Sequence, residues 1–350
     1  MPSLAPDEYT LETTYLNTAS YGLPSARALT AVRDAGAGWA TGRSGPGSSL
    51  DLLVPDLRAG FARLLDGATA DDIALGGGIA GLIAPVAAAL PPGAEVLLPE
   101  GEFSSVSMPF VYRGDLVVRF VPLPELAAQV RPETALVAVS VVQSADGRVT
   151  DLAELCAATR ANGARLLVDA TQAAGWLPLR FADADYWVCA SFKWLIGARS
   201  VAFFATAPEF VTELRPVGSS WYAAENRWAE LYRPVALPPT ARRFDATPDW
   251  LGVIAALAGL SLIEELTMDK IGAHNLELAD RFREGLRELG FQPVVARSPI
   301  VSVPGAANAA ARLEEANVIA SARAGGLRFA FHFYNSTDDV ERALSALAAG

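Results

Sequence analysis

A carboxylate and an amine lie at or just after the ends of two apolar, strand-like runs of the chain. The run Leu166–Val168 ends in Asp169, and the run Tyr186–Ala190 is followed three residues later by Lys193. Groups at the carboxyl ends of parallel strands face the ligand crevice of an α/β sheet. A lysine among apolar neighbours loses hydration as an ammonium, which lowers its pKa and makes it a candidate nucleophile. Taken singly, Asp169 is equally well explained as a turn cap, and Lys193 as a surface lysine.

A third segment with chemical potential is the glycine run Gly76–Gly78, between a strand-like run and a helical one. Backbone N–H groups in such a turn, together with a helix N-terminus, can hold a phosphate. Pyridoxal phosphate requires an anion site, a partner for its ring nitrogen and an amine for its aldehyde. The glycine run, Asp169 and Lys193 supply these three groups in this order, so the combination predicts pyridoxal phosphate as the cofactor.

Periodicity predicts the elements that must position these groups. Continuous apolar runs alternate with amphipathic segments, which is typical of an α/β fold whose mostly parallel sheet is covered on both faces. Helices are expected at 80–90 and 152–162. Seven strands are expected at Ile73–Leu75, Glu95–Leu98, Val117–Val121, Leu136–Val142, Arg165–Asp169, Tyr186–Ala190 and Val201–Ala205.

The pattern changes after a proline-rich loop at Arg233–Thr240. Thr247 is expected to cap a long helix that runs toward residue 290 and is bent or broken at 269–273. A smaller α+β domain follows. Its expected strands are Phe291–Val295, Ile300–Val303 and Leu327–Phe331. The segment after 337 is expected to form the final helix, capped by Ser336 or Thr337.

Composition limits the classes of partner. The chain has 350 residues, 51% of them hydrophobic, which is enough for two domains with a large core. A formal net charge of -11 argues against nucleic acid or an anionic membrane as the main partner. Two cysteines and two histidines provide neither a disulfide framework nor a zinc site, so no metal is expected. Without a signal-like stretch at the N-terminus, we expect a cytoplasmic protein that acts on a small molecule.

Four motifs together resemble those of a known family. They are the segment Tyr15–Gly22, the Asp-Ala-x-Gln-x-x-Gly pattern that starts at Asp169, the Lys-Trp-Leu pattern at Lys193, and an arginine, Arg328, seven residues before Asn335. The chain resembles the class V aminotransferases, pyridoxal-phosphate enzymes that include cysteine desulfurases, kynureninase, isopenicillin N epimerase-like proteins and small C–S lyases. The resemblance implies fold type I, with an N-terminal arm at 1–20, a large cofactor domain at 21–246, and a connecting helix and small domain at 247–350.

The resemblance also implies roles around the cofactor ring. Lys193 forms the Schiff base and later moves the Cα proton as base and acid. Asp169 keeps the pyridine nitrogen protonated, so that the ring acts as an electron sink. Gln172 lies near the phenolic oxygen, and either Gln143 or Ser144 also reaches it.

Further positions match cofactor contacts of the family. Gly77, Gly78 and Ile79 match the phosphate loop, and Ser191 can add a hydroxyl. Phe103 matches the residue whose ring stacks on the cofactor, although without the resemblance it would be assigned to the core. Thr247 matches the threonine that reaches the phosphate of a neighbouring subunit, which implies a homodimer with shared active sites.

Substrate contacts follow from the remaining motifs. Arg328 matches the arginine that binds the substrate α-carboxylate, a task suited to a planar, two-pronged donor, although a surface salt bridge is its ordinary alternative. Asn17 and Tyr21 are expected beside the substrate. Arg323 is near enough in sequence to help, without an assigned role.

One departure from the family narrows the expected reaction. Cysteine desulfurases carry a nucleophilic cysteine shortly before the carboxylate arginine, and the segment Val318–Arg328 contains none. We therefore expect an enzyme that forms an external aldimine with an amino acid or a cysteine conjugate and removes its Cα proton, leading to transamination or to β-elimination as a C–S lyase. Epimerisation, decarboxylation or deamination on the same fold is the alternative, and a non-catalytic binding protein is a remote one.

Overall fold

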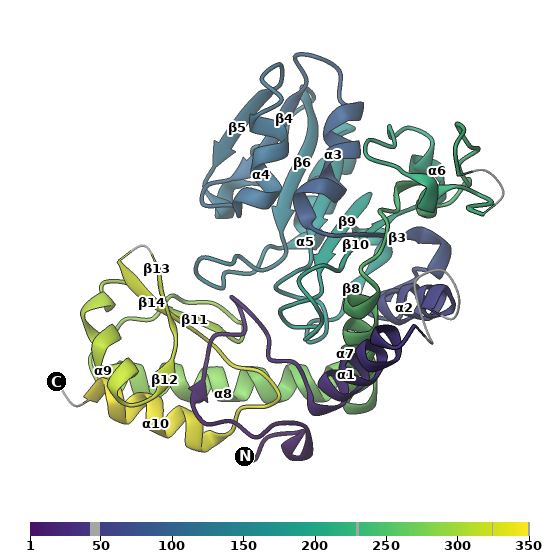
Figure 1. Ribbon diagram of the computed structural model, residues 1–350. Coiled ribbons are helices and arrows are strands. Elements are labelled where there is room, and N and C mark those ends of the chain that lie inside the picture. Colours follow the sequence, from purple (N-terminus) through teal and green to yellow (C-terminus); the bar gives the residue numbers. More distant parts are fainter. Residues whose placement is uncertain (43–49, 229–230, 324, 349–350) are drawn as a thin grey trace.

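A seven-stranded sheet forms the centre of the computed structural model, which describes residues 1–42, 50–228, 231–323 and 325–348 (Figure 1). Its strands are β3 (Ile73–Gly76), β4 (Glu95–Pro99), β5 (Val117–Val121), β6 (Thr134–Ser140), β7 (Arg165–Asp169), β9 (Tyr186–Ala190) and β10 (Ala202–Thr206). Their order is β3-β10-β9-β7-β6-β4-β5. Only β10 is antiparallel to its neighbours, β3 and β9. The expected α/β fold with a mostly parallel seven-stranded sheet is confirmed.

Helices cover both faces of this sheet because successive strand residues point to opposite sides. On β10, Phe203 packs into one apolar core and Phe204 into the other. The first core contains residues of α2 (Leu53–Ala62), α5 (Leu152–Asn162) and α7 (Trp250–Leu266), and the second contains residues of α3 (Ile79–Ala89) and α4 (Ser104–Val111). A sheet buried on both sides explains why its strands are continuous apolar runs rather than alternating ones.

Local signals fix α5 at the expected residues. The Asp151 carboxylate accepts a hydrogen bond from the Glu154 backbone N–H at 2.9 Å, which satisfies one of the free N–H groups at the helix start. Gly163 ends the helix with φ 71°, a left-handed conformation that glycine adopts without strain. The boundaries of α5 are therefore encoded by adjacent residues.

The connecting helix differs from the expectation at both its start and its break. The structure has two helices, α7 and α8 (Met268–Glu288), which meet at 84°. The break is at Thr267, with φ 68°, so the expectation of a bend at 269–273 was wrong by a few residues. Asp249, rather than Thr247, precedes the first turn of α7. Among the described residues, no single helix is long and apolar enough to cross a membrane, and α7 and α8 pass that test only as this bent pair.

A second, smaller sheet packs on α8 and α10 (Thr337–Ala348) (Figure 1). It consists of β11 (Ile300–Val303), β14 (Gly326–Ala330) and β13 (Ser321–Arg323), in that order and antiparallel. The strand expected at Phe291–Val295 was wrong. The Val294 N–H donates to the Ser302 carbonyl of β11 at 2.8 Å, but the adjacent Pro293 has no N–H to donate and Val295 is 86% exposed, so this contact does not extend into a strand.

The N-terminal segment runs along this smaller sheet toward the large one. β1 (Thr14–Tyr15) pairs with β12 (Val318–Ile319), and Asn17 bridges to Ala330 of β14. The domain limits expected at residues 20 and 246 remain predictions. The other elements are α1 (Ala26–Ala40), α6 (Pro208–Val211), α9 (Ala310–Glu315), β2 (Leu65–Asp66), β8 (Leu179–Arg180), and 3-10 helices at Pro6–Glu8, Leu50–Leu52, Ala70–Asp72, Leu123–Glu125, Phe181–Asp183, Trp221–Ala223, Ala241–Phe244 and Ala307–Ala309.

Candidate active site

The carboxyl ends of neighbouring strands bring the predicted lysine and carboxylate together. Asp169 is the last residue of β7, and Lys193 follows β9, which pairs with β7 in parallel. Both side chains are buried, with 4% and 6% of their surface exposed. The Lys193 Nζ lies 5.1 Å from the centre of the Phe103 ring and 5.8 Å from that of Phe192. An amine, a carboxylate and an aromatic ring therefore share one edge of the sheet.

Burial controls the protonation of Lys193. Loss of hydration lowers the pKa of this amine to about 8, while the Asp169 carboxylate opposes the shift. The positive charges of Arg328 and Arg323 lower the pKa further. A pKa near 8 gives a sizeable fraction of neutral amine at mildly alkaline pH, which is the form that attacks a carbonyl or accepts a proton.

Asp169 is shifted in the opposite direction for the same reason. Burial raises the pKa of its carboxyl to about 6, while the Thr171 hydrogen bonds and the Lys193 charge act against that rise. The Thr171 N–H donates to Asp169 Oδ1 at 2.8 Å. The Asp169 carboxyl is mostly ionised at neutral pH. Burial of its charge costs free energy, and a second cationic partner would reduce that cost. A protonated ring nitrogen is such a partner.

The glycine run lies where the sequence predicts an anion site. β3 ends at Gly76 and α3 begins at Ile79, so the free N–H groups of the first turn of α3 and its positive dipole end adjoin the loop. A Cβ placed on Gly78 would have no atom within 4 Å, and one on Gly77 would meet only the Ser200 carbonyl at 3.9 Å. The α-carbons of Gly77 and Gly78 therefore face no packed side chain, which leaves the loop open to an approaching anion.

The position of Phe103 depends on Glu102, whose role the sequence interpretation missed. One oxygen of the Glu102 carboxylate accepts from the Phe103 N–H at 2.7 Å and the Ser140 hydroxyl at 2.6 Å. The other accepts from the Ser140 N–H at 2.8 Å and from Gln143 Nε2 at 3.1 Å. Phe103 is 41% exposed, so it is not a core residue. Glu102 therefore ties the exposed ring, the end of β6 and Gln143 into one unit.

Gln172 connects the loop of the lysine to two other loops. Its Oε1 accepts from Trp194 Nε1 at 2.7 Å, and its Nε2 donates to the Ala19 carbonyl at 2.9 Å and to Ser144 Oγ at 3.0 Å. The side-chain amide is thus engaged within the chain. Contact of Gln172, Gln143 or Ser144 with the phenolic oxygen remains a prediction.

Arg328 is a buried cation without a carboxylate partner among the described residues. It is 1% exposed and donates to the Ser144 carbonyl, to Ser144 Oγ at 3.0 Å and to Ser20 Oγ at 2.7 Å. Its Nε has no partner, nor does the buried Oδ1 of Asn17. Burial, reinforced by Arg323, lowers the pKa of this guanidinium to about 9. A buried, uncompensated arginine beside Lys193 fits an anionic ligand.

The segment with Tyr21 lies against the lysine loop. The Gly22 N–H donates to the Phe192 carbonyl at 2.8 Å, and a Cβ on Gly22 would lie 1.9 Å from the Lys193 carbonyl oxygen. Only glycine permits this approach. The Tyr21 ring is 6.0 Å from that of Phe192, and the Arg199 guanidinium lies 5.0 Å from its centre. Ser20 and Gly22 lie in the Tyr15–Gly22 motif, but the sequence interpretation gave neither residue a role of its own, and it did not single out Arg199.

Two other predicted residues have different surroundings. The Ser191 hydroxyl donates to the Ala198 carbonyl at 2.7 Å, which stabilises the turn after Lys193. Thr247 is exposed, with its hydroxyl 3.3 Å from that of Ser220. Their cofactor contacts remain predictions.

The histidines have structural partners. His332 is buried 3.0 Å from the Trp194 carbonyl, and burial lowers its pKa to about 3. Over the part of the chain that the structure describes, no group of three His, Cys, Asp or Glu could hold a metal.

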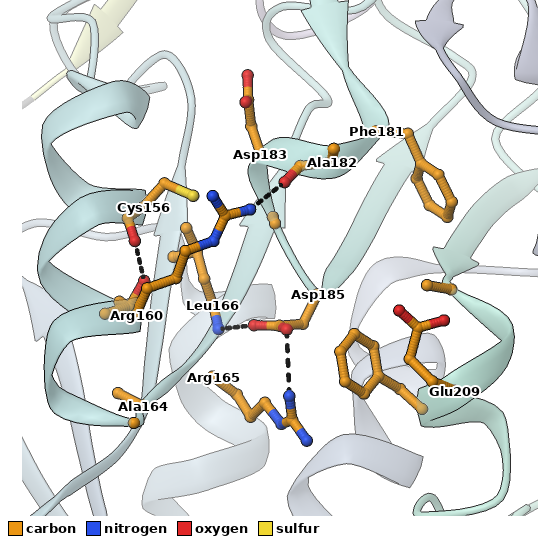
Figure 2. A pocket seen from close by; sticks show the side chains of 15 residues that line it. Cys156, Arg160, Ala164, Arg165, Leu166, Phe181, Ala182, Asp183, Asp185 and Glu209 are labelled. Atoms are coloured by element: carbon orange, nitrogen blue, oxygen red, sulfur yellow. Dashed lines mark hydrogen bonds and ion pairs between the residues drawn. The ribbon is translucent and has the colours of Figure 1, made fainter.

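A separate pocket of about 590 Å³ lies at the amino end of β7, where Arg165 begins the strand that Asp169 ends (Figure 2). Several of its charged groups have partners within the chain. Asp185 accepts from the Leu166 N–H at 2.6 Å and pairs with Arg165 at 3.4 Å, and Arg160 donates to the Ala182 carbonyl at 2.8 Å (Figure 2). This pocket is distinct from the candidate active site.

The fold and the site define a fold type I pyridoxal-phosphate enzyme. The family model "Aminotransferase class-V" matches residues 57–343, and the chain belongs to this family. The buried Asp169–Lys193 pair, the open glycine loop and the exposed Phe103 ring fit the cofactor of the family.

Relatives and solved structures agree with this assignment. An uncharacterised aminotransferase, YcbU, of Bacillus subtilis (strain 168) is 28% identical, with 83% of this chain and 81% of the relative covered. Isopenicillin N epimerase of Streptomyces clavuligerus is 28% identical, covering 85% and 84%. A solved cystine C-S lyase, C-DES, in complex with cysteine persulfide matches with TM-score 0.87 and 23% identity, covering 97% of this chain and 98% of that one. This structural match establishes the fold.

Proposed function

We propose that the protein binds an amino acid and removes its Cα proton, leading to transamination or to β-elimination at a carbon–sulfur bond. The observation that carries the proposal is Arg328, a buried cation without a carboxylate partner in the described chain, next to the Lys193 amine. An amino acid has the α-carboxylate that such an arginine binds. When bound, pyridoxal phosphate supplies an electron sink for the negative charge that develops at Cα.

The residues of this chain divide the remaining work. Arg328 binds and orients the α-carboxylate, and its hydrogen bonds to Ser20 and Ser144 fix the guanidinium plane. Lys193 accepts the Cα proton and returns it, a task suited to an amine with a pKa near 8. Phe103 covers the ring of the cofactor, and Asp169 supplies the anion for its nitrogen.

A persulfide carried on an enzyme cysteine, as in a desulfurase, is disfavoured by the environment of both cysteines. Cys189 lies within β9 and is fully buried, and burial raises the pKa of its thiol. Cys156 is 7% exposed in the wall of the pocket at the amino end of β7, away from Asp169 at the other end of the strand, and burial raises the pKa of its thiol (Figure 2). A nucleophilic cysteine must be accessible and readily ionised, so neither thiol fits the desulfurase role.

Epimerisation is the second candidate, because Lys193 could return the proton to Cα and because isopenicillin N epimerase is a relative. The same first step serves all three outcomes. Product analysis therefore separates them.

The decisive experiment mixes purified holoenzyme with a panel of amino acids and cysteine S-conjugates and follows the cofactor spectrum together with keto-acid formation. Conversion of the cofactor to its amine form indicates transamination. Pyruvate with a released thiol indicates β-elimination, and loss of optical activity without a keto acid indicates epimerisation. An unchanged spectrum with every substrate would refute the proposal and favour a binding protein.

The chain offers a matched control, because Lys193 and the exposed Lys270 are its only lysines. Borohydride reduction followed by peptide mass analysis should place the cofactor on Lys193 alone. Lys193→Ala should lower turnover by about 100-fold or more, whereas Lys270→Ala should leave it unchanged. Full activity in Lys193→Ala would remove the proposed base.

We also propose a homodimer in which the exposed Thr247 contributes to the partner's site. Sedimentation should give twice the chain mass. Mixing inactive Thr247→Ala and Lys193→Ala proteins should restore part of the activity if the sites are shared, and no recovery would contradict sharing.

A further inference from the structure

We infer that Arg323 and Arg328 form a paired anion site, and that the substrate is an amino acid whose side chain carries a second acidic group. The inference rests on the proposed function and specifies its substrate class. Arg328 binds the α-carboxylate, and Arg323 binds the distal carboxylate or an oxyacid of similar shape.

A short hairpin places the two arginines on one face. Ser321 of β13 is directly opposite Arg328 of β14. Arg323 is two residues from Ser321, so its side chain points to the same side of the hairpin as that of Arg328. Gly325, with φ 77°, lies in the turn between the strands. The register thus fixes the pair as neighbours.

Both guanidinium groups converge on one hydroxyl of the N-terminal segment. Ser20 Oγ accepts from Arg328 Nη2 at 2.7 Å and from Arg323 Nη2 at 3.3 Å. This neutral oxygen is the only side-chain acceptor that the described structure gives Arg323. Two cations held at one neutral acceptor repel each other, in agreement with the lowered pKa of Arg328 beside Arg323.

The pair stands out in a chain of formal net charge -11. In the described ranges most arginines with polar contacts pair with Asp or Glu, but neither member of this pair has a carboxylate within 4.0 Å. The two members also differ in access, since Arg328 is buried and Arg323 is exposed. A ligand with one inner and one outer anionic group would match this arrangement.

The apolar rings near Lys193 offer the competing interpretation. Phe103 and Phe192 lie within 6 Å of its Nζ, and a bulky neutral substituent would pack on them. Such a substrate leaves the charge of Arg323 without a partner. A dicarboxylic amino acid uses both arginines, and each charge-assisted hydrogen bond is worth about tenfold or more in affinity.

The binding test uses holoenzyme and unreactive acids, so that it does not depend on turnover. Calorimetry should show succinate or glutarate binding at least about tenfold more tightly than butyrate. In Arg323→Gln this preference should fall to about threefold or less, while butyrate binding stays unchanged. Arg297→Gln, which alters another exposed arginine, should keep the full preference. Equal affinities for mono- and dicarboxylates in the unmodified protein would overturn the inference.

The kinetic test separates this inference from the proposed function. Aspartate or glutamate should exceed asparagine or glutamine in kcat/KM by about tenfold or more, and Arg323→Gln should remove the difference through KM. If neutral amino acids react equally well and Arg323→Gln has no effect, the paired site is refuted while the proposed function stands. If dicarboxylates bind through Arg323 but no amino acid changes the cofactor spectrum, the anion site stands and the proposed function fails.

Discussion

Replacing Asp169 with asparagine should stabilise the cofactor-free protein at neutral pH while it impairs the enzyme. The pKa of the Asp169 carboxyl is about 6 in the folded chain, against an ordinary value of 3.8. Between these two pKa values the folded state binds more protons than the unfolded state. The free energy of unfolding therefore decreases as pH rises from about 4 to 6, because the buried carboxyl becomes charged. Below that window the cost is absent, and above it the cost is complete.

The magnitude follows from this shift. A shift of about two pKa units lowers the free energy of unfolding by about 3 kcal/mol once the carboxyl is fully ionised. About 2 kcal/mol of this loss falls between pH 4.5 and 7.5. An asparagine side chain at this position would have no such titration and would keep an oxygen to accept from the Thr171 N–H. The free energy of unfolding of Asp169→Asn relative to the unmodified chain should therefore increase by about 2 kcal/mol over that interval.

The assay is urea unfolding of both cofactor-free proteins at about pH 4.5, 6 and 7.5. Asp66→Asn, at an exposed carboxylate, is the matched control and should show no such trend. A stability difference for Asp169→Asn that does not change with pH, or that falls as pH rises, would refute the reasoning. The holoenzyme should show the opposite effect, with weaker cofactor binding, because the ring nitrogen loses its anionic partner.

Two further predictions concern packing, one at the site and one at a buried ion pair elsewhere in the fold. Gly22→Ala should abolish activity and cost several kcal/mol of stability, because its Cβ would lie 1.9 Å from the Lys193 carbonyl oxygen. Its control is Gly36→Ala, whose Cβ would have no atom within 4 Å and which should stabilise the protein by about 1 kcal/mol. Thermal or urea melts measure both changes. Arg58→Met should cost about 3–5 kcal/mol in the same melts, because it leaves the carboxylate of the buried 2.6 Å Arg58–Asp245 pair uncompensated. Adding Asp245→Leu should recover most of that loss. A double variant as unstable as Arg58→Met would contradict this account.

Elements encoded by adjacent residues could be predicted from the sequence. The helix expected at 152–162 was correct, and in the structure its ends coincide with the cap at Asp151 and the left-handed Gly163. The strand expected at Phe291–Val295 and the unexpected β13 show the limit of this approach. Whether a short apolar segment becomes a strand depends on a partner at the right register, and that partner is distant in the chain.

The same distinction applies to the candidate site. Asp169 and Lys193 were recognisable because the first ends an apolar run and the second follows such a run within three residues. The roles of Glu102, Ser20 and Gly22 were not, because their contacts join distant segments. The bond from Arg328 to Ser20, for example, spans 308 residues of sequence. Periodicity carries no information about such contacts.

The sequence by itself determined the chemical inventory of this protein: an amine, a carboxylate and a glycine loop at the ends of strands in an α/β fold. These features are local, since they need only residue types and strand periodicity. Only the tertiary structure decided their electrostatic state. The opposite pKa shifts of Lys193 and Asp169 arise from burial, and the pairing of Arg323 with Arg328 arises from hairpin register. Burial and register are properties of the packed chain, because both depend on which distant segments lie against each residue.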